Sequence, residues 1–418
     1  MLFCGNFGSS SCALFRSVLY FSKGRFHSKG NLMKQCFPRQ LWRVAVLAIG
    51  IFVARGVAFG VSQYVITNDD PGVSFFSVGP NGALTLAQEV IAGGFGTVAG
   101  FFGADRLSVL NGGNQQCVYS SAASTATITG IVVSSLTLGG SATGSPTDGG
   151  TSNGIGLAMN SQYLYASFTD SNTIGTFQVQ SGCSLTFVND VAVSGLAGGI
   201  INGMAIHANI LIATYTDGSI ESFDISNGTP VSHGDKQYST ATLQSLDATY
   251  PNSIDISSDG HYAIFGDTST SVVVEVSDIS SGKLTPTKVY TTKNSISSSN
   301  VMLSPDETLL YIVNTQGAAV SVMFFDKTKG TLSVGCKSGR ISGRSSNWSY
   351  LAGAALASTT GNGGGVYVAE FGAPSAIALV NLTVSGQTCS LEEVKASPFA
   401  EKNSQGLLSI GSFPPRSF

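Results

Sequence analysis

Residues 304–332 read SPDETLLYIVNTQGAAVSVMFFDKTKGTL. The aliphatic–aromatic pair Leu310-Tyr311 marks one apolar strand, Asn314-Thr315 marks a turn, and Val320–Phe325 forms a second apolar run. Asn and Gly favour the tight turns of hairpins, so Gly330-Thr331-Leu332 predicts a further turn into another strand. This stretch therefore predicts consecutive antiparallel strands joined by short turns.

The same order of strands and turns recurs along the chain, with 43 to 57 residues between repeats. Each repeat has a second strand that contains an apolar anchor. The anchors are Tyr64-Val65, Leu107, Leu164-Tyr165, Leu211-Ile212, Ala263-Ile264, Leu310-Tyr311 and Val366-Tyr367. A four-stranded unit of this length, repeated in series, is typical of a β-propeller. We therefore predict an all-β fold, a seven-bladed β-propeller with four antiparallel strands per blade, as a single domain over residues 61–418.

The two ends of this domain complete one blade. The first repeat begins at its second strand, Gln63–Thr67, whereas Gly406–Ile410 near the C-terminus resembles the first strands Gly203–Ile206 and Ser253–Ile256. We expect the C-terminal strand to join the first blade, which closes the ring and removes exposed sheet edges. The Ser-, Gly- and Thr-rich segment Ser134–Asn153 is predicted to be a surface insertion between two blades.

Residues 1–60 have a different composition, with eight Lys or Arg and no acidic residue. Three basic residues in segment 34–43 precede the apolar run Val44–Ala54, and Ala58-Phe59-Gly60 supplies the small residues of a cleavage site, as in a secretory signal. The apolar run would span about 16 Å as a helix, half of a bilayer core, so a cleaved signal is favoured over an anchor. We expect an exported protein, periplasmic or extracellular, with Met33 as the probable start of translation.

The predicted mature part is acidic, with 13 basic and 24 acidic residues and a net charge of −11. An acidic body without a basic stripe argues against nucleic acid as a partner. No other segment is apolar over the length that a bilayer requires. We expect a monomer without a transmembrane helix once the signal is removed.

Four cysteines lie in the predicted mature part, and an exported protein would pair them in one of three ways. Cys183 and Cys389 occupy the same place in the repeat, the turn between third and fourth strands. Cys117 is placed in a third strand and Cys336 in a fourth, each in the preceding blade. Because a disulfide needs Cα atoms within about 7 Å, we predict Cys117–Cys183 and Cys336–Cys389. No Cys or His spacing predicts a metal site.

Several short motifs carry a family resemblance. Tyr64-Val65-Ile66-Thr67-Asn68 resembles the Tyr-Val-x-Asn strand of the propellers known by a Tyr-Val-Thr-Asn repeat, and Ser304-Pro305-Asp306-Glu307 and Ser257-Ser258-Asp259-Gly260 resemble the Ser-Pro-Asp-Gly turn of the same superfamily. Together with Gly330-Thr331-Leu332, they make the chain similar to the 6-phosphogluconolactonase-type lactonase family over nearly all of 61–418. The resemblance implies a propeller that hydrolyses a sugar lactone at the mouth of its central channel.

The family's chemistry is associated with histidines near the channel, often introduced by Pro-His before a first strand. Here that place reads Pro251-Asn252. His207 and His261 fall at turns between first and second strands, and His233 falls at the start of a fourth strand. No catalytic residue is therefore carried over from the family.

Amide side chains stand two residues before the first apolar residue of five predicted inner strands. They are Asn153, Asn202, Asn252, Asn300 and Gln405. At the channel mouth they would offer donors and acceptors to a small hydroxylated ligand or a glycan. The alternative is that each amide caps the backbone of a tight entry turn.

Two acids are the weak catalytic candidates. Asp255 lies between Ile254 and Ile256 in an inner strand, and Glu370 ends a second strand. Either could act as a base or hold a divalent metal, or be a hydrogen-bonded structural acid. No cofactor motif is evident. Two functions remain open: a lactonase-like hydrolase of a sugar lactone, or a non-catalytic binding or surface-interaction propeller.

Overall fold

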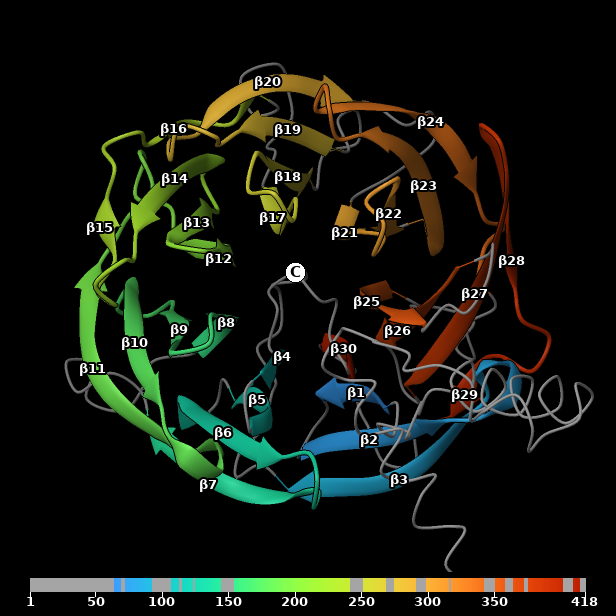
Figure 1. Ribbon diagram of the computed structural model, residues 1–418, viewed down its shortest axis with the longest axis horizontal. Coiled ribbons are helices and arrows are strands. Elements are labelled where there is room, and N and C mark those ends of the chain that lie inside the picture. Colours follow the sequence, from blue (N-terminus) through green and yellow to red (C-terminus); the bar gives the residue numbers. More distant parts are fainter. Residues whose placement is uncertain are drawn as a thin grey trace, which may run out of the picture. The chain divides into compact units, whose positions relative to one another are not determined.

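Short apolar strands and glycine-bearing turns form seven antiparallel sheets, and the computed structural model arranges them in a ring (Figure 1). The structure describes residues 64–68, 72–91, 107–112, 115–122, 125–143, 154–240, 251–267, 274–290, 298–315, 317–341, 350–357, 364–371, 375–400 and 409–413. The predicted export signal, Asn153 and Gln405 lie outside the described residues. The prediction of a seven-bladed propeller is confirmed.

Each blade has four strands that pair antiparallel in series from the centre outward, and we number the blades 1–7 by their second strands. The innermost strands of blades 1–7 are β30 (Ser409–Phe413), β4 (Leu107–Gly112), β8 (Gly154–Met159), β12 (Ile201–His207), β17 (Pro251–Ile256), β21 (Ser298–Leu303) and β25 (Tyr350–Ala357). The second strands are β1 (Tyr64–Asn68), β5 (Gln115–Ala122), β9 (Tyr163–Phe168), β13 (Ile210–Tyr215), β18 (Tyr262–Asp267), β22 (Leu309–Asn314) and β26 (Gly365–Phe371).

The outer half of each blade follows in the same order. The third strands are β2 (Gly72–Val78), β6 (Thr127–Val132), β10 (Thr173–Val179), β14 (Ser219–Asp224), β19 (Val274–Asp278), β23 (Ala319–Asp326) and β27 (Ala376–Ser385). The fourth strands are β3 (Leu84–Ile91), β7 (Thr137–Thr143), β11 (Leu185–Ala192), β15 (Val231–Ser232), β20 (Thr285–Tyr290), β24 (Thr331–Lys337) and β28 (Thr388–Glu393). Two short strands, β16 (Gln237–Tyr238) and β29 (Phe399–Ala400), also pair with the third strands of blades 4 and 7.

Blade 1 is completed from the C-terminal end of the chain, as predicted. β30 pairs antiparallel with β1, so that Phe413 lies opposite Tyr64 and Ser409 lies opposite Asn68. The strand lies further along the chain than predicted, at Ser409–Phe413, and residues 406–408 are outside the described part.

The core is divided among the seven interfaces between neighbouring blades, with one cluster of buried apolar side chains in each. A second strand contributes to two of them, because successive side chains of a strand point to opposite faces. Leu310 and Ile312 pack against blade 5, whereas Tyr311 packs against blade 7. Both faces of the sheet are therefore buried, which explains the nearly continuous apolar run at 309–313.

The turns between third and fourth strands agree with the sequence in six blades. Each contains a glycine in the left-handed region: Gly82, Gly182, Gly228, Gly282, Gly330 and Gly386, with φ between +59° and +82°. Blade 2 has Leu136 instead, at φ 52°. Its turn therefore lacks the glycine signal that marks the other blades.

Blade 2 is where the strand prediction was wrong. Leu107 begins the innermost strand β4, not a second strand, and Cys117 lies in the second strand β5, not a third. A hairpin signal such as Asn111-Gly112 can join any two antiparallel strands, so it did not show which pair it joins. Val118-Tyr119 is the aliphatic–aromatic pair that corresponds to Leu164-Tyr165.

The predicted insertion Ser134–Asn153 contains a fourth strand, β7, while residues 144–153 are outside the described part. β7 lacks apolar alternation because the turn of blade 3 packs directly on it. A Cβ added to Gly139 would collide with the carbonyl oxygen of Gly182. Glycine is therefore required where the backbones of the two blades meet.

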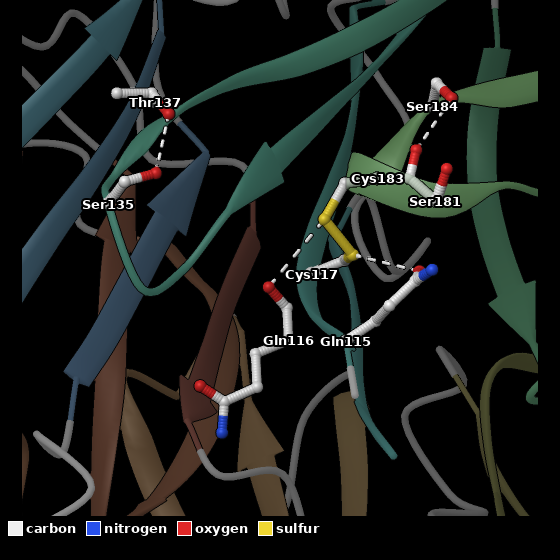
Figure 2. Close-up of a disulfide and its surroundings, with 8 residues drawn as sticks. All are labelled: Gln115, Gln116, Cys117, Ser135, Thr137, Ser181, Cys183 and Ser184. Atoms are coloured by element: carbon white, nitrogen blue, oxygen red, sulfur yellow. Dashed lines mark hydrogen bonds between the residues drawn. A yellow bond between two sulfur atoms is a disulfide. The ribbon is translucent and has the colours of Figure 1, made fainter. Parts of the chain in front are cut away.

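Both predicted cysteine pairs form disulfides. Cys117 bonds to Cys183 with a Cα–Cα distance of 5.6 Å, and Cys336 bonds to Cys389 with 5.5 Å. Figure 2 shows the first, which joins β5 of blade 2 to the turn that precedes β11 of blade 3. Each disulfide links one blade to the next.

Candidate functional site

A cavity of about 280 Å³ lies at the centre of the ring and is bordered by residues of all seven innermost strands. Pockets for drug-sized ligands usually measure about 300–1,000 Å³, so this cavity suits a small ligand. Its position on the axis follows from the fold, because only the innermost strands of a propeller face the centre (Figure 1).

One position of the repeat borders the cavity in every blade, and we call these seven residues the middle ring. Each lies opposite the second-strand residue that packs toward the following blade. The middle ring consists of Gly411, Ser108, Ala158, Ala205, Asp255, Met302 and Ala355, in the order of blades 1–7. Five of the seven are Gly, Ala or Ser, so short side chains leave the centre hollow at this level.

The residues on either side of the middle ring are mainly apolar. Leu157, Met204 and Ile254 precede it, and Ile206 and Ile256 follow it, all bordering the cavity. Ser108 and Ser412 supply hydroxyl groups. Among the described residues that border the cavity, Asp255 alone carries a charge.

Asp255 is held in place by two backbone groups. Its Oδ1 accepts a hydrogen bond from the N–H of Ile256 at 2.8 Å, and its Oδ2 accepts one from the N–H of Leu303 at 2.6 Å. Leu303 belongs to the innermost strand of blade 6, so the carboxylate ties blade 5 to its neighbour. The hydrogen bonds fix the orientation of a partly exposed carboxylate at the cavity wall.

Blade 5 stands across the cavity from blades 1 and 2. Figure 1 shows β17 on one side of the centre and β4 and β30 on the other. Asp255 therefore occupies the wall opposite the strands that carry Ser108 and Ser412. A small ligand between these walls would meet a carboxylate on one side and hydroxyl groups on the other.

The predicted ring of amides is only partly assembled. Asn202 and Asn252 are equivalent, since each is the extra residue at a register shift near the start of its inner strand, and both are buried. The Nδ2 of Asn202 donates to the carbonyl oxygen of Pro251 at 3.2 Å, which links the inner strand of blade 4 to that of blade 5. Asn300 pairs with Val313, so it lies one position later in its inner strand than Asn202 and Asn252 do in theirs. None of these three borders the cavity.

Glu370 also lies away from the cavity lining and is buried at the end of β26. Its position opposite the start of the inner strand corresponds to Asp267 and Asn314 in blades 5 and 6, both of them buried. Asn68 ends the second strand of blade 1 one position earlier in the register, and its Nδ2 donates to the hydroxyl of Ser120 at 2.6 Å in the next blade. Apart from Glu370, these residues were not predicted from the sequence, although each ends an apolar second strand with a polar side chain.

The histidines have structural surroundings. His207 packs on Gly260, and His261 lies 3.5 Å from a carboxylate oxygen of Asp259 at an exposed turn. The Nδ1 of His233 lies 2.9 Å from the hydroxyl of Ser222, which is fully buried in β14. None of the three is among the described residues that border the cavity.

Within the described part of the chain, no group of three or more His, Cys, Asp or Glu residues is arranged to hold a metal ion. The same residues include no helix with the length and apolar character needed to cross a membrane.

Comparisons with solved structures find the same fold. A functionally unknown protein from Desulfotomaculum acetoxidans is 14% identical and superposes with a TM-score of 0.60 over 84% of this chain and 98% of its own. A candidate 6-phosphogluconolactonase from Bacteroides uniformis is 15% identical, with a TM-score of 0.61 over 84% and 100%. A second, from Bacteroides fragilis, is 14% identical, with a TM-score of 0.60 over 85% and 99%. At such identities the likeness establishes the fold alone.

No curated protein sequence matches the chain. A profile of the family described as "Lactonase, 7-bladed beta-propeller" matches residues 119–404, more than half of the chain. The matched region runs from the second blade through the seventh, and the structure closes the same seven-bladed ring. The chain therefore belongs to the lactonase family of seven-bladed β-propellers.

Proposed function

We propose that the protein is an exported, monomeric hydrolase that opens a small sugar lactone in its central cavity, with Asp255 as the general base. The observation that carries this proposal is the placement of one fixed carboxylate in a middle ring of small side chains. Membership of the lactonase family supports the reaction class, while the site itself supports the residue.

The chemistry requires a base, a water molecule and a way to stabilise negative charge. Asp255 takes a proton from water as the water oxygen bonds to the lactone carbonyl carbon. The bond from that carbon to the ring oxygen then breaks, and Asp255 returns the proton to the departing oxygen. The product is an open-chain hydroxy acid.

The opposite wall suits the developing oxyanion. Ser108 and Ser412 border the cavity on β4 and β30, the strands that Figure 1 shows across the centre from β17, and their hydroxyl groups would donate hydrogen bonds to the carbonyl oxygen. The apolar residues on either side exclude water from the remainder of the cavity, which strengthens these interactions.

A second function, ligand binding without catalysis, is favoured by one observation. Both oxygens of Asp255 accept backbone N–H groups, as the oxygens of a structural acid do. In that case the carboxylate braces β17 against β21, and the cavity is a binding pocket for a small hydroxylated compound. The two functions differ in one measurable property, the rate of lactone opening.

Export is supported by the two disulfides, because disulfides persist in oxidising compartments. It is also supported by the basic and apolar order of residues 34–60. Fractionation of cells that express the full chain, with N-terminal sequencing of the mature protein, tests this part of the proposal.

The test of catalysis is a pH-stat assay with a panel of γ- and δ-lactones, corrected for spontaneous hydrolysis. We expect Asp255→Asn to lower kcat by about 10²-fold or more, because a general base contributes about 10²–10⁴ to the rate. Asp255→Glu, which keeps a displaced carboxylate, should retain more activity than Asp255→Asn. Melting temperatures of both variants show whether the fold is intact. If the unaltered protein opens no lactone, the binding function stands; if folded Asp255→Asn keeps the full rate, Asp255 is not the base.

A further inference from the structure

We infer that the central cavity discriminates against negatively charged lactones and takes an unphosphorylated one, with Asp255 as the residue that sets this preference. The inference rests on the proposed function and names its substrate class. It departs from the substrate in the names of the two Bacteroides proteins, which carries a phosphate group.

The sign and position of the charge on Asp255 disfavour an anionic ligand. The middle ring places the Asp255 carboxylate on the wall of a cavity of about 280 Å³, so any ligand inside lies close to it. Two backbone N–H groups hold the carboxylate in place, so it cannot turn away from an approaching anion. A phosphate monoester carries a charge of about −1.5 to −2 at neutral pH, and like charges repel more strongly where water is excluded.

The remaining walls of the cavity are mainly apolar and also disfavour a phosphate group. Aliphatic and thioether side chains such as Ile254, Met204 and Met302 border the cavity next to Asp255. A phosphate that enters must give up its hydration, and apolar walls return nothing for it. A neutral sugar ring gives up less hydration free energy when it enters the cavity. Ser108, Ser412 and Asp255 can also form hydrogen bonds with its hydroxyl groups.

The long-range electrostatic field of the propeller acts in the same direction. The part of the chain from residue 61 onward, which forms the propeller, has a net charge of −11, so the propeller repels anions during approach. This contribution weakens as salt screens it, whereas the repulsion inside the cavity persists. A preference that survives in 0.5 M salt therefore originates in the cavity.

The experiment uses two substrates that differ only in the phosphate, glucono-δ-lactone and 6-phosphoglucono-δ-lactone. We expect kcat/KM to be at least tenfold higher for the unphosphorylated lactone, at both low and high salt. Ala205→Lys introduces a cation into the middle ring in the neighbouring blade, and it should reduce this ratio at least fivefold. Val334→Lys is the matched control, because Val334 is 73% exposed on β24 at the outer edge of blade 6, and it should leave the ratio unchanged.

Binding of the corresponding lactams, which resist opening, separates the two proposals. By calorimetry, gluconolactam should bind the unaltered protein at least tenfold more tightly than its 6-phosphate. Ala205→Lys should reduce this ratio of the two dissociation constants. Lactam binding with this preference but without lactone hydrolysis would refute the proposed function and uphold the charge discrimination. Equal or tighter binding of the phosphorylated lactam, or binding of neither lactam, would overturn the inference.

Discussion

At the scale of single residues, the middle ring shows how one position of the repeat can differ among the blades. Five blades place Gly, Ala or Ser in the middle ring and so create a hollow, and blade 5 places Asp255 there. A carboxylate within an apolar inner strand is costly unless hydrogen bonds compensate it. Ile256 and Leu303 supply those bonds. Asp255 is therefore a brace between two blades, and under the proposed function it is also the charged group that a ligand in the cavity would meet.

Asp217 illustrates an acid with a purely structural surrounding. One oxygen accepts the N–H groups of Ala197 at 2.7 Å and Gly199 at 3.1 Å, and the other accepts the N–H of Ser219 at 3.0 Å and its hydroxyl at 2.5 Å. Partial burial alone would raise the pKa of Asp217, but the hydrogen bonds from Ser219, Ala197 and Gly199 lower it below its ordinary value. The carboxylate thereby holds the connection between blades 3 and 4.

We predict that Asp217→Asn lowers the free energy of unfolding at pH 7 by about 1 kcal/mol, because the side chain is partly exposed. The pKa is lower in the folded chain than in the unfolded chain, where it is about 4, so this contribution is complete above that pH and is lost as the pH falls through the folded value. The difference between variant and native protein should thus shrink below about pH 4. Urea unfolding at pH 7, 5, 4 and 3 measures it.

Asp224→Asn is the matched control, because hydrogen bonds from Ser226 also lower the pKa of Asp224, yet they come from a residue of its own turn and do not tie two blades together. It should change the stability little at any pH. A loss for Asp217→Asn that is the same at pH 7 and pH 3 would contradict the role of its ionised form.

At the scale of elements, the turn between third and fourth strands of each blade, or the start of its fourth strand, docks on the preceding blade, and the seven junctions use different chemistry. Disulfides join blades 2 to 3 and 6 to 7. Tyrosine rings pack on turn glycines at three junctions: Tyr163 on Gly228, Tyr262 on Gly330 and Tyr367 on Gly82. Side-chain hydrogen bonds complete the remaining two, from Gln88 to the carbonyl oxygen of Leu136 and from the N–H of Leu284 to Asp235.

The junction between blades 7 and 1 makes a sharp prediction, because it closes the ring. The hydroxyl of Tyr367 donates to the carbonyl oxygen of Gly82 at 2.8 Å, and the side chain is buried, which raises the pKa of Tyr367 to about 12. We predict that Tyr367→Phe lowers the free energy of unfolding by about 1 kcal/mol, because the partly buried carbonyl oxygen of Gly82 loses its hydrogen-bond donor. Urea unfolding of the variant and the native protein measures this change in free energy, and their melting temperatures provide a second measurement.

Tyr165→Phe provides the comparison. Tyr165 occupies the corresponding position in blade 3 and is equally buried, but its hydroxyl has no hydrogen-bond partner among the described residues. Its removal should leave stability unchanged or raise it slightly. If both variants lose the same stability, the hydrogen bond from Tyr367 to Gly82 does not account for the loss at this junction.

At the scale of the whole molecule, the ring depends on a strand from the far end of the chain. β30 pairs with β1 along its full length and also forms part of the cavity wall through Gly411 and Ser412. Phe413 is completely buried between blades 1 and 2. Ring closure and the shape of the central cavity are therefore parts of the same structure.

We predict that a chain that ends at residue 408, without β30, loses cooperative unfolding and binds a hydrophobic dye. The reason is that β1 would be left with an unpaired inner edge and a buried apolar cluster would be opened. A chain that ends at Phe413 keeps all of β30 and serves as the control. Cooperative unfolding of the shorter chain at the same midpoint as the control would refute the role of β30 in closure.

The sequence by itself determined the number of blades, five of the six glycine turns between third and fourth strands, the joining of the two ends and both disulfide pairs. These features depend on local patterns: alternation of apolar residues, turn residues with positive φ, and cysteines at a fixed place in the repeat. Blade 2 shows the limit. Leu136 replaces the glycine of its turn, and strand β7 lacks an apolar pattern, so its strands could not be counted correctly.

Only the tertiary structure decided which residues meet at the centre. Register shifts near the start of the inner strands make Asn202 and Asn252 equivalent but displace Asn300, because Val301, not Met302, corresponds to Met204 and Ile254. The middle ring is likewise invisible in the sequence, since its seven members come from seven strands spread over the whole chain. Pairing register and closure of the ring are non-local, and they alone bring Asp255 to face the strands of Ser108 and Ser412 across one cavity.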